Sequence, residues 1–149
     1  MSTDREQQTL TSRDGTRLNA VVWAPERHLE RTLVITHGLA EHMGRYEHVA
    51  EAFVEAGWRV IGLELRGHGD SDGKRGHVDA WSRYVEDLQA AIAFADGPVW
   101  ILGHSMGGLI AISTVCRACF SARATIASQE LFIVPKGPPP KVEAPKFHW

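Results

Sequence analysis

A serine flanked by two glycines is the feature that most constrains this chain of 149 residues. Ser105 lies two positions after Gly103 and two before Gly107. The apolar run over residues 99–102 predicts a buried strand before the motif, and the apolar stretch from Leu109 predicts a helix after it. Together they predict a sharp turn from strand to helix, in which the serine backbone is strained and only glycine fits two residues to either side.

The predicted turn would place the Ser105 hydroxyl above a sheet edge, where the N-terminus of the next helix favours a developing oxyanion. Ser105 is therefore the candidate nucleophile, and the Met106 N–H is one candidate oxyanion donor. The second donor is expected from a loop after an earlier strand, which here is the Leu39 N–H. The alternative is that His37-Gly38 forms only a tight turn.

The first 112 residues alternate between strand and helix patterns. This alternation predicts an α/β fold with right-handed crossovers and a mostly parallel sheet. Period-two patterns on both sides of Asp14-Gly15 predict an N-terminal hairpin within residues 7–23. Further strands are expected over residues 32–36, 58–65 and 99–102, and helices over residues 46–54 and 81–95.

The character of the chain changes near Ser113, which separates a regular domain (residues 1–112) from an atypical tail (residues 113–149). Five of the seven prolines lie in the tail, and Pro138-Pro139-Pro140 excludes a regular helix or central strand there. Residues 1–112 include 11 basic and 16 acidic residues, whereas the tail has 5 basic and 2 acidic residues. We expect the α/β core to be truncated after the serine turn and residues 136–145 to be extended and exposed.

Composition excludes several classes of protein. The net charge of −2 gives no electrostatic basis for a nucleic-acid partner. No apolar run approaches the roughly 20 residues that span a bilayer, and residues 1–8 are too polar for a secretory signal. These observations predict a cytoplasmic protein and leave open a peripheral contact with a membrane surface. They do not indicate an oligomeric state.

The histidines and cysteines do not form a pattern typical of a metal site. The clustered histidines lack an acid at zincin-type spacing, and the cysteine pair has neither a second pair nor a redox helix start. We therefore expect no metal and no cofactor, and we expect His104, inside the serine turn, to orient backbone. The residues concerned are His37, His42, His48, Cys116 and Cys119.

Three runs of residues resemble the monoacylglycerol lipase and lysophospholipase branch of the α/β-hydrolases, also described as serine aminopeptidase S33-like. They are residues 37–46 (HGLAEHMGRY), 66–73 (RGHGDSDG) and 103–108 (GHSMGG), within a resemblance that covers about residues 8–112. The resemblance implies an α/β-hydrolase core that cleaves a carboxylic ester of the monoacylglycerol or lysolipid type through an acyl-serine intermediate.

The resemblance also implies roles for individual residues. Ser105 is the nucleophile, the Leu39 and Met106 amides form the oxyanion hole, and Glu41 and Arg45 brace the oxyanion loop. The supporting residues are His37, Gly38, Glu41, Arg45, Gly103, His104 and Gly107.

The chain departs from the family after Ser105. The triad order in this fold is Ser, then Asp or Glu, then His. After Ser105 there is no aspartate; the acids are Glu130 and Glu143, and the histidine is His148. A truncated or frame-shifted reading of a longer gene fits this break, and a genuine short variant is the alternative. A sheet that stops after the serine strand would also leave an edge uncovered, which predicts poor stability.

Three functions therefore stay open. The first is a serine ester hydrolase acting on a small acyl ester or lipid. The second is a catalytically inactive fragment or a non-catalytic binding remnant, because a serine without its base is a weak nucleophile. The third keeps the fold and changes the reaction to that of a thioesterase, acyltransferase or peptidase.

Overall fold

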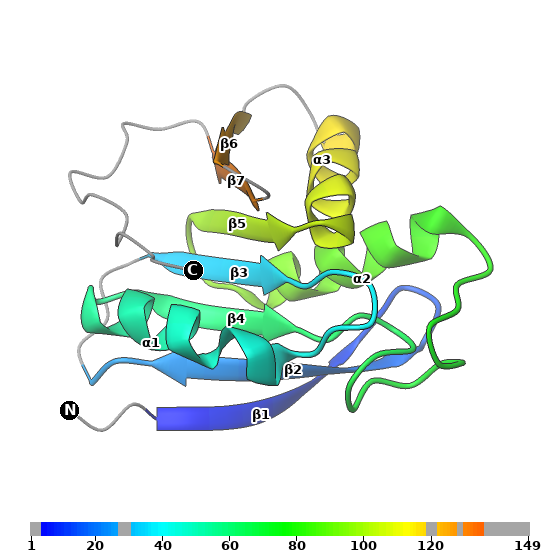
Figure 1. The fold of residues 1–149 in the computed structure, drawn as a ribbon, viewed down its shortest axis with the longest axis horizontal. Helices are drawn as coiled ribbons and strands as arrows, with labels where there is room; N and C mark the ends of the chain where they lie inside the picture. Colours follow the sequence, from blue (N-terminus) through cyan, green and yellow to red (C-terminus); the bar gives the residue numbers. More distant parts are fainter. Residues whose placement is uncertain (1–3, 27–30, 119–121, 128–129, 136–149) are drawn as a thin grey trace.

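The computed structural model describes residues 4–26, 31–118, 122–127 and 130–135, with side chains up to residue 116. These residues form one mixed sheet with helices on both faces (Figure 1). The sheet order is β1-β2-β4-β3-β5-β7-β6. The strands are β1 (Asp4–Thr11), β2 (Arg17–Ala24), β3 (Thr32–Thr36), β4 (Arg59–Leu63), β5 (Val99–His104), β6 (Ala122–Ala127) and β7 (Glu130–Pro135). The helices are η1 (Met43–Tyr46), α1 (Glu47–Glu55), α2 (Trp81–Phe94) and α3 (Met106–Ala118).

The N-terminal hairpin is confirmed. β1 and β2 pair antiparallel from Asp4–Ala24 to Thr11–Arg17. Gly15 takes a φ of 88° in the connecting turn, a conformation that glycine adopts without a steric penalty. The side chain of Asp14 also accepts a 3.1 Å hydrogen bond from the Thr16 amide, which closes the turn.

The centre of the sheet is parallel and aligns the strand ends that matter for the candidate site. β3 pairs in parallel with β4 on one side and with β5 on the other. Thr36 is opposite both Leu63 and Gly103 in these two ladders. The residues that follow, His37, Glu64 and His104, therefore emerge at one edge of the sheet, where ligand sites of α/β proteins lie.

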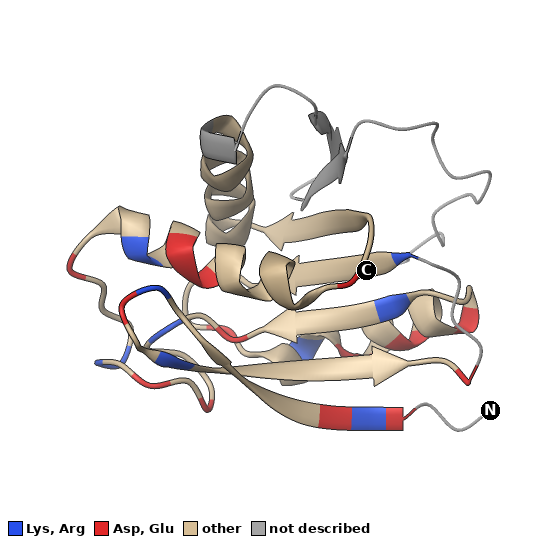
Figure 2. Cartoon of the chain, turned by 180° about the vertical axis from the view of Figure 1, so that it is seen from behind, with Lys and Arg blue, Asp and Glu red and all other residues tan. Residues whose placement is uncertain are grey.

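The helices cover the two faces of the sheet unequally. Helix α1 packs on one face through Val49 and Phe53, beside Trp23 and Leu102. Helices α2 and α3 pack on the other face, around Leu88 and the inward side chains of the hairpin (Figure 1). Charged residues lie mainly on loops, helices and the ends of strands, and β3 and β5 carry none (Figure 2). The two uncharged central strands match the apolar patterns from which they were predicted.

The second half of the chain has two features that the sequence patterns did not predict. Helix α3 begins at Met106, not near Leu109, because the turn at Ser105 leads directly into its first helical residue. The sheet also does not stop at β5, since β7 pairs antiparallel with it over Ile101–His104. Parallel pairing among the described strands is consequently confined to β4, β3 and β5. Residues 136–145, expected to be extended, lie outside the described residues.

Candidate active site

The turn between β5 and α3 has the geometry that requires its two glycines. Ser105 has a φ of 52°, in the left-handed region that is costly for a residue with a side chain. A Cβ atom on Gly103 would lie 2.6 Å from the carbonyl oxygen of Gly107. A Cβ atom on Gly107 would overlap the Thr36 carbonyl at the end of β3. The turn therefore needs one glycine to close on itself and the other to pack against the neighbouring strand.

The loop after β3 lies directly beside this turn. A Cβ atom on Gly38 would be 3.3 Å from Cβ of Ser105 and 3.3 Å from Nδ1 of His104. The next residue, Leu39, is 60% exposed, and its N–H has no hydrogen-bond partner among the described residues. Met106 opens α3, where the N–H groups of the first turn lack intrahelical partners. The structure thus brings both predicted oxyanion donors next to Ser105; their role stays a prediction.

Glu41 ties this loop to the serine turn. Its Oε2 atom accepts hydrogen bonds from the Gly38 amide at 2.8 Å and from the Tyr46 hydroxyl at 2.6 Å. The same oxygen lies 3.2 Å from Nδ1 of His104, and Arg45 Nε is 3.5 Å from the other oxygen. Burial raises the pKa of the carboxyl, but the hydrogen bonds outweigh burial and bring the pKa of Glu41 below its ordinary value. Glu41 is therefore an anionic brace between the two loops.

His37 is buried under the loop and is fully engaged. Its Nε2 atom accepts the Leu65 amide at 3.1 Å, and its Nδ1 atom donates to the Gly38 carbonyl at 2.7 Å. Desolvation lowers the pKa of His37 to about 4. The ring is consequently neutral at neutral pH, and it supports the loop with both nitrogens. It has no nitrogen left to take a proton from Ser105.

The sequence did not single out Glu64, which the structure places at the centre of the support. The residue is 5% exposed, and its carboxylate accepts hydrogen bonds from the Met43 amide at 3.1 Å and the Asp70 amide at 2.7 Å. Asn19 of β2 donates a third at 3.1 Å. Burial raises the pKa of Glu64, but these donors lower it below its ordinary value. The sequence signal that could have identified Glu64 was its position, as an acidic residue directly after the buried strand β4.

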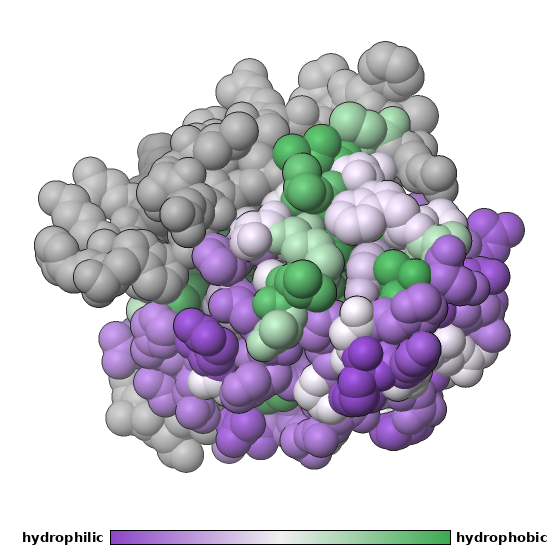
Figure 3. Space-filling model, turned by 45° about the vertical axis from the view of Figure 1, so that its right-hand side comes forward, coloured by the Kyte–Doolittle hydropathy of each residue, from purple (hydrophilic) through white to green (hydrophobic). Residues whose placement is uncertain are grey.

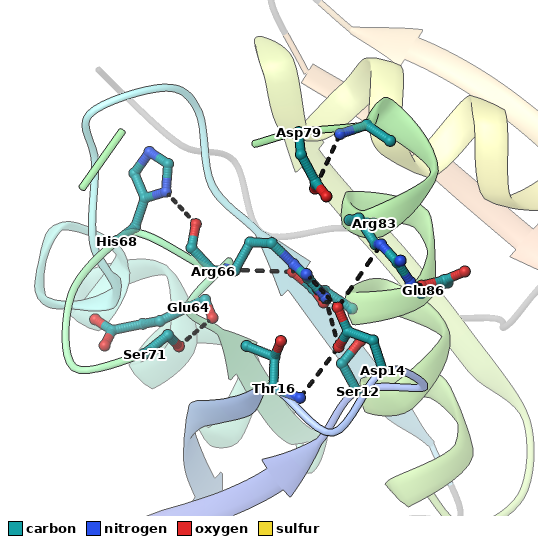
Figure 4. A network of polar contacts seen from close by, with 12 residues as sticks. Ser12, Asp14, Thr16, Glu64, Arg66, His68, Ser71, Asp79, Arg83 and Glu86 are labelled. Carbon is teal, nitrogen blue, oxygen red and sulfur yellow. Dashed lines mark hydrogen bonds and ion pairs between the residues drawn. The ribbon is translucent and has the colours of Figure 1, made fainter. Parts of the chain in front are cut away.

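A second polar network fixes the loop over residues 66–73 (Figure 4). The Arg66 guanidinium donates to the fully buried Asp87 of α2 through Nη2 at 2.6 Å and through Nε at 2.9 Å. It also binds Asp14 of the hairpin turn at 2.7 Å. Hydrogen bonds to Asp87 and Asp14 raise the pKa of Arg66, and the Arg66 partner lowers the pKa of Asp14. Arg66 thereby joins three segments that are far apart in sequence: the hairpin turn, the loop over residues 66–73 and helix α2.

Ser105 has no general base among the described residues. Its hydroxyl makes no hydrogen bond to any of them, and His104 turns Nδ1 toward Glu41. Glu130 is described only as the first residue of β7, opposite His104 in the ladder. Glu143 and His148, the remaining downstream candidates, lie outside the described residues. The described part of the site therefore offers a candidate nucleophile and two candidate oxyanion donors without a base.

The described residues also offer little to a metal ion. Within them, no three His, Cys, Asp or Glu side chains gather in a group that could hold one. Cys116 is exposed and unpaired on α3, and Cys119 lies outside the described residues. No helix in this part of the chain is both long and apolar enough to cross a bilayer.

Apolar side chains are exposed on the loop and the helix that adjoin Ser105 and at the start of α2. Leu109 and Ile112, one and two helical turns after the serine on α3, are 59% and 41% exposed. Trp81 at the start of α2 is also exposed, and its Nε1 atom donates to the Ser113 hydroxyl at 3.2 Å. Figure 3, which brings this side forward, shows apolar atoms in the upper half of the face above a mostly hydrophilic lower half. With Leu39, these are the large apolar side chains that the described residues expose.

Comparison with known proteins identifies the family. The family model described as "Serine aminopeptidase, S33" (Hydrolase_4) matches residues 27–144. The chain belongs to the serine aminopeptidase S33 family. The chain is also 40% identical over 122 residues to a monoacylglycerol lipase of Mycolicibacterium smegmatis. It is 38% identical over 96 residues to the phospholipase YtpA of Bacillus subtilis. The predicted monoacylglycerol lipase branch is therefore confirmed.

The chain spans less than half the length of these two relatives. The match covers 78% of this chain and 44% of the M. smegmatis lipase, and 62% of this chain and 37% of the B. subtilis phospholipase. Among solved structures, Est1E of Butyrivibrio proteoclasticus with bound ferulic acid is similar, with a TM-score of 0.64 and 26% identity. That match covers 73% of this chain and 47% of Est1E. These similarities confirm an α/β-hydrolase core.

Proposed function

We propose that Ser105 is the nucleophile of a carboxylic ester hydrolase of the monoacylglycerol or lysolipid type. The observation that carries the proposal is the strained Ser105, with a φ of 52°, beside the backbone of Gly38. The Leu39 and Met106 amides are the proposed oxyanion donors. A tetrahedral oxyanion requires such donors at about 2.7–3.1 Å, held in place before the reaction.

The reaction would proceed in two steps. The Ser105 oxygen attacks the ester carbonyl carbon and loses its proton to a general base. The tetrahedral intermediate then expels the alcohol, which takes up a proton, and leaves an acyl-serine. In the second step, water attacks the acyl carbon, releases the carboxylic acid and restores the serine hydroxyl. Since both steps need a base, we expect the 149-residue chain alone to turn over slowly or not at all.

A non-catalytic role is the second candidate, and the Ser105 hydroxyl, which has no base beside it among the described residues, favours it. The removal of triad members typically leaves only the residual catalysis of the oxyanion hole and substrate binding. In this case the chain would be an inactive remnant that still binds a lipid or another partner. Thioesterase, acyltransferase and peptidase reactions use the same elbow, but the names of the two relatives described above support an ester or a lipid as substrate.

The exposed apolar residues near Ser105 support a lipid as the substrate. Leu39 lies on the loop beside the serine turn, and Leu109 and Ile112 lie on the helix that follows Ser105; all three are exposed and could contact an acyl chain or the surface of a lipid aggregate. Contact with a membrane surface is therefore part of the proposal.

Turnover of monoacylglycerol and p-nitrophenyl esters tests the proposed function, with the M. smegmatis relative as the positive control. We expect the unmodified chain to be far slower than this relative and the Ser105→Ala variant to lose the serine-dependent part of the rate. The His148→Ala variant should match the unmodified chain. Robust turnover that disappears in both variants would instead establish a short triad within this chain.

A further inference from the structure

The loop after β3 (residues 37–43), here called the oxyanion loop, is held at its Met43 end by the carboxylate of Glu64, which lies outside the loop. We infer that Glu64 is a positioning residue for the proposed reaction, which fixes the loop through the Met43 amide and so keeps the Leu39 amide against Ser105. The inference rests on the proposed function, because it assigns Glu64 a role in the same site. Glu64 itself follows β4 and acts only through the loop.

The loop contains a strained residue and therefore needs support at both ends. Ala40 has a φ of 58°, a conformation that persists in a residue with a side chain only where the surroundings impose it. On one side of Ala40, Glu41 accepts the Gly38 amide at 2.8 Å. On the other side, Glu64 accepts the Met43 amide at 3.1 Å. Leu39 lies between these two attachments, so its position depends on both.

The Glu64 carboxylate is itself immobilised by segments distant in sequence. One oxygen accepts hydrogen bonds from the Asn19 side chain at 3.1 Å and from the Asp70 amide at 2.7 Å. The loop can approach this closely because residue 69 is glycine; a Cβ atom there would overlap the carboxylate. The other oxygen is directed to Met43, whose side chain is 0% exposed. Glu64 thus transmits the rigidity of the sheet to the oxyanion loop.

The division of donors between the two oxygens predicts what an isosteric change does. A glutamine offers one accepting oxygen and an amino group that only donates. The side with two donors, Asn19 and Asp70, should retain the oxygen. The amino group would then face the Met43 N–H, which cannot accept from it. Glu64→Gln should therefore release the Met43 end of the loop while the side chain keeps its size.

Amide hydrogen exchange followed by NMR on the 149-residue chain tests this inference without requiring turnover. In Glu64→Gln we expect the Met43 amide to exchange about tenfold faster or more, and the Leu39 amide resonance to shift. The exchange of Val34 and Ile61, in the centre of the sheet, should stay unchanged. The matched control is Glu55→Gln, at an exposed position on α1, which should alter none of these amides.

Two results would overturn the inference. One is a Glu64→Gln variant whose Met43 and Leu39 amides behave as in the control. The other is an equal loss of protection in the loop and the sheet, which would make Glu64 a brace of the fold as a whole. If the variant does not fold, the unmodified chain decides: the inference requires a protected Met43 amide, and exchange near the unfolded rate contradicts it. A failed Ser105 assignment would appear in serine labelling and would leave these exchange rates untouched.

Discussion

The Leu65 amide donates a 3.1 Å hydrogen bond to Nε2 of His37, a ring that is completely buried. This contact needs the neutral imidazole, and desolvation lowers the pKa of His37 to about 4 from an ordinary value of 6.5. The unfolded chain therefore binds a proton near pH 6.5, whereas the folded chain resists it until about pH 4. His37 thus makes stability fall as the pH drops through this window.

The size of this effect follows from the shift. Linkage gives a loss on the order of 3 kcal/mol in the free energy of unfolding between pH 7 and pH 4. Urea denaturation at a series of pH values measures it. His37→Gln should flatten the curve between pH 6.5 and 4, whereas the exposed His77→Gln should leave it unchanged. An equally steep curve in His37→Gln would contradict this explanation.

The Arg66–Asp87 pair is expected to contribute far more to stability than the neighbouring Arg83–Glu86 pair. Asp87 is fully buried, so Asp87→Asn leaves an under-compensated guanidinium and should cost about 3 kcal/mol. Arg83 and Glu86 form a 3.0 Å pair on α2 in which Arg83 is 35% exposed and also lies 3.7 Å from Asp14, so Glu86→Gln should cost much less than Asp87→Asn. Chemical denaturation compares the two variants, and similar losses would refute the importance assigned to Arg66.

The glycine at the start of α3 is expected to be intolerant of a methyl group. Gly107→Ala would gain helix propensity, yet its Cβ atom would overlap the Thr36 carbonyl, so we expect a net loss of about 2 kcal/mol. Gly97→Ala is the control, because a Cβ atom there meets no atom within 4 Å. An alanine held at the φ of 74° found for Gly97 should lower the free energy of unfolding by only about 1 kcal/mol. A Gly107→Ala variant as stable as the parent would show that the turn yields easily.

The apolar surface beside Ser105 is expected to mediate contact with lipid. Leu109→Asp places a charge on a side chain that is 59% exposed and should weaken binding to phosphatidylcholine vesicles about tenfold, since it costs more than one buried apolar contact. Vesicle flotation measures the bound fraction, with Glu51→Gln on α1 as the control. Equal binding of Leu109→Asp and the unmodified chain would remove this surface from the proposal.

Local patterns in the sequence were sufficient for the centre of the fold and for the serine turn. The hairpin follows from period-two patterns around Gly15, and the elbow follows from the spacing of Gly103, Ser105 and Gly107. Both depend on neighbours along the chain, so sequence spacing alone describes them. The position of the Leu39 loop followed from the rule that parallel strands end at one edge.

Features that depend on strand register could not be predicted in this way. Glu64 reaches the Met43 amide because Thr36 and Leu63 are opposite each other in the β3–β4 ladder, a pairing that no local pattern specifies. The exact start of α3 could not be read from the apolar pattern, which begins at Leu109, because Gly107 and Gly108 are poor helix formers; at Gly107, close packing against β3 outweighs propensity. The strand β7 was missed because its partner, β5, lies about thirty residues earlier.

Fluorophosphonate labelling with peptide mapping by mass spectrometry tests the central claim, that the fold presents Ser105 as the nucleophile, most directly. The account predicts one adduct, on Ser105, formed much more slowly than on the M. smegmatis relative because no described residue supplies a base. Ser105→Ala should abolish the adduct, and Ser113→Ala should preserve it. An adduct on another residue, unchanged labelling of Ser105→Ala, or no adduct on Ser105 after prolonged exposure would contradict the account.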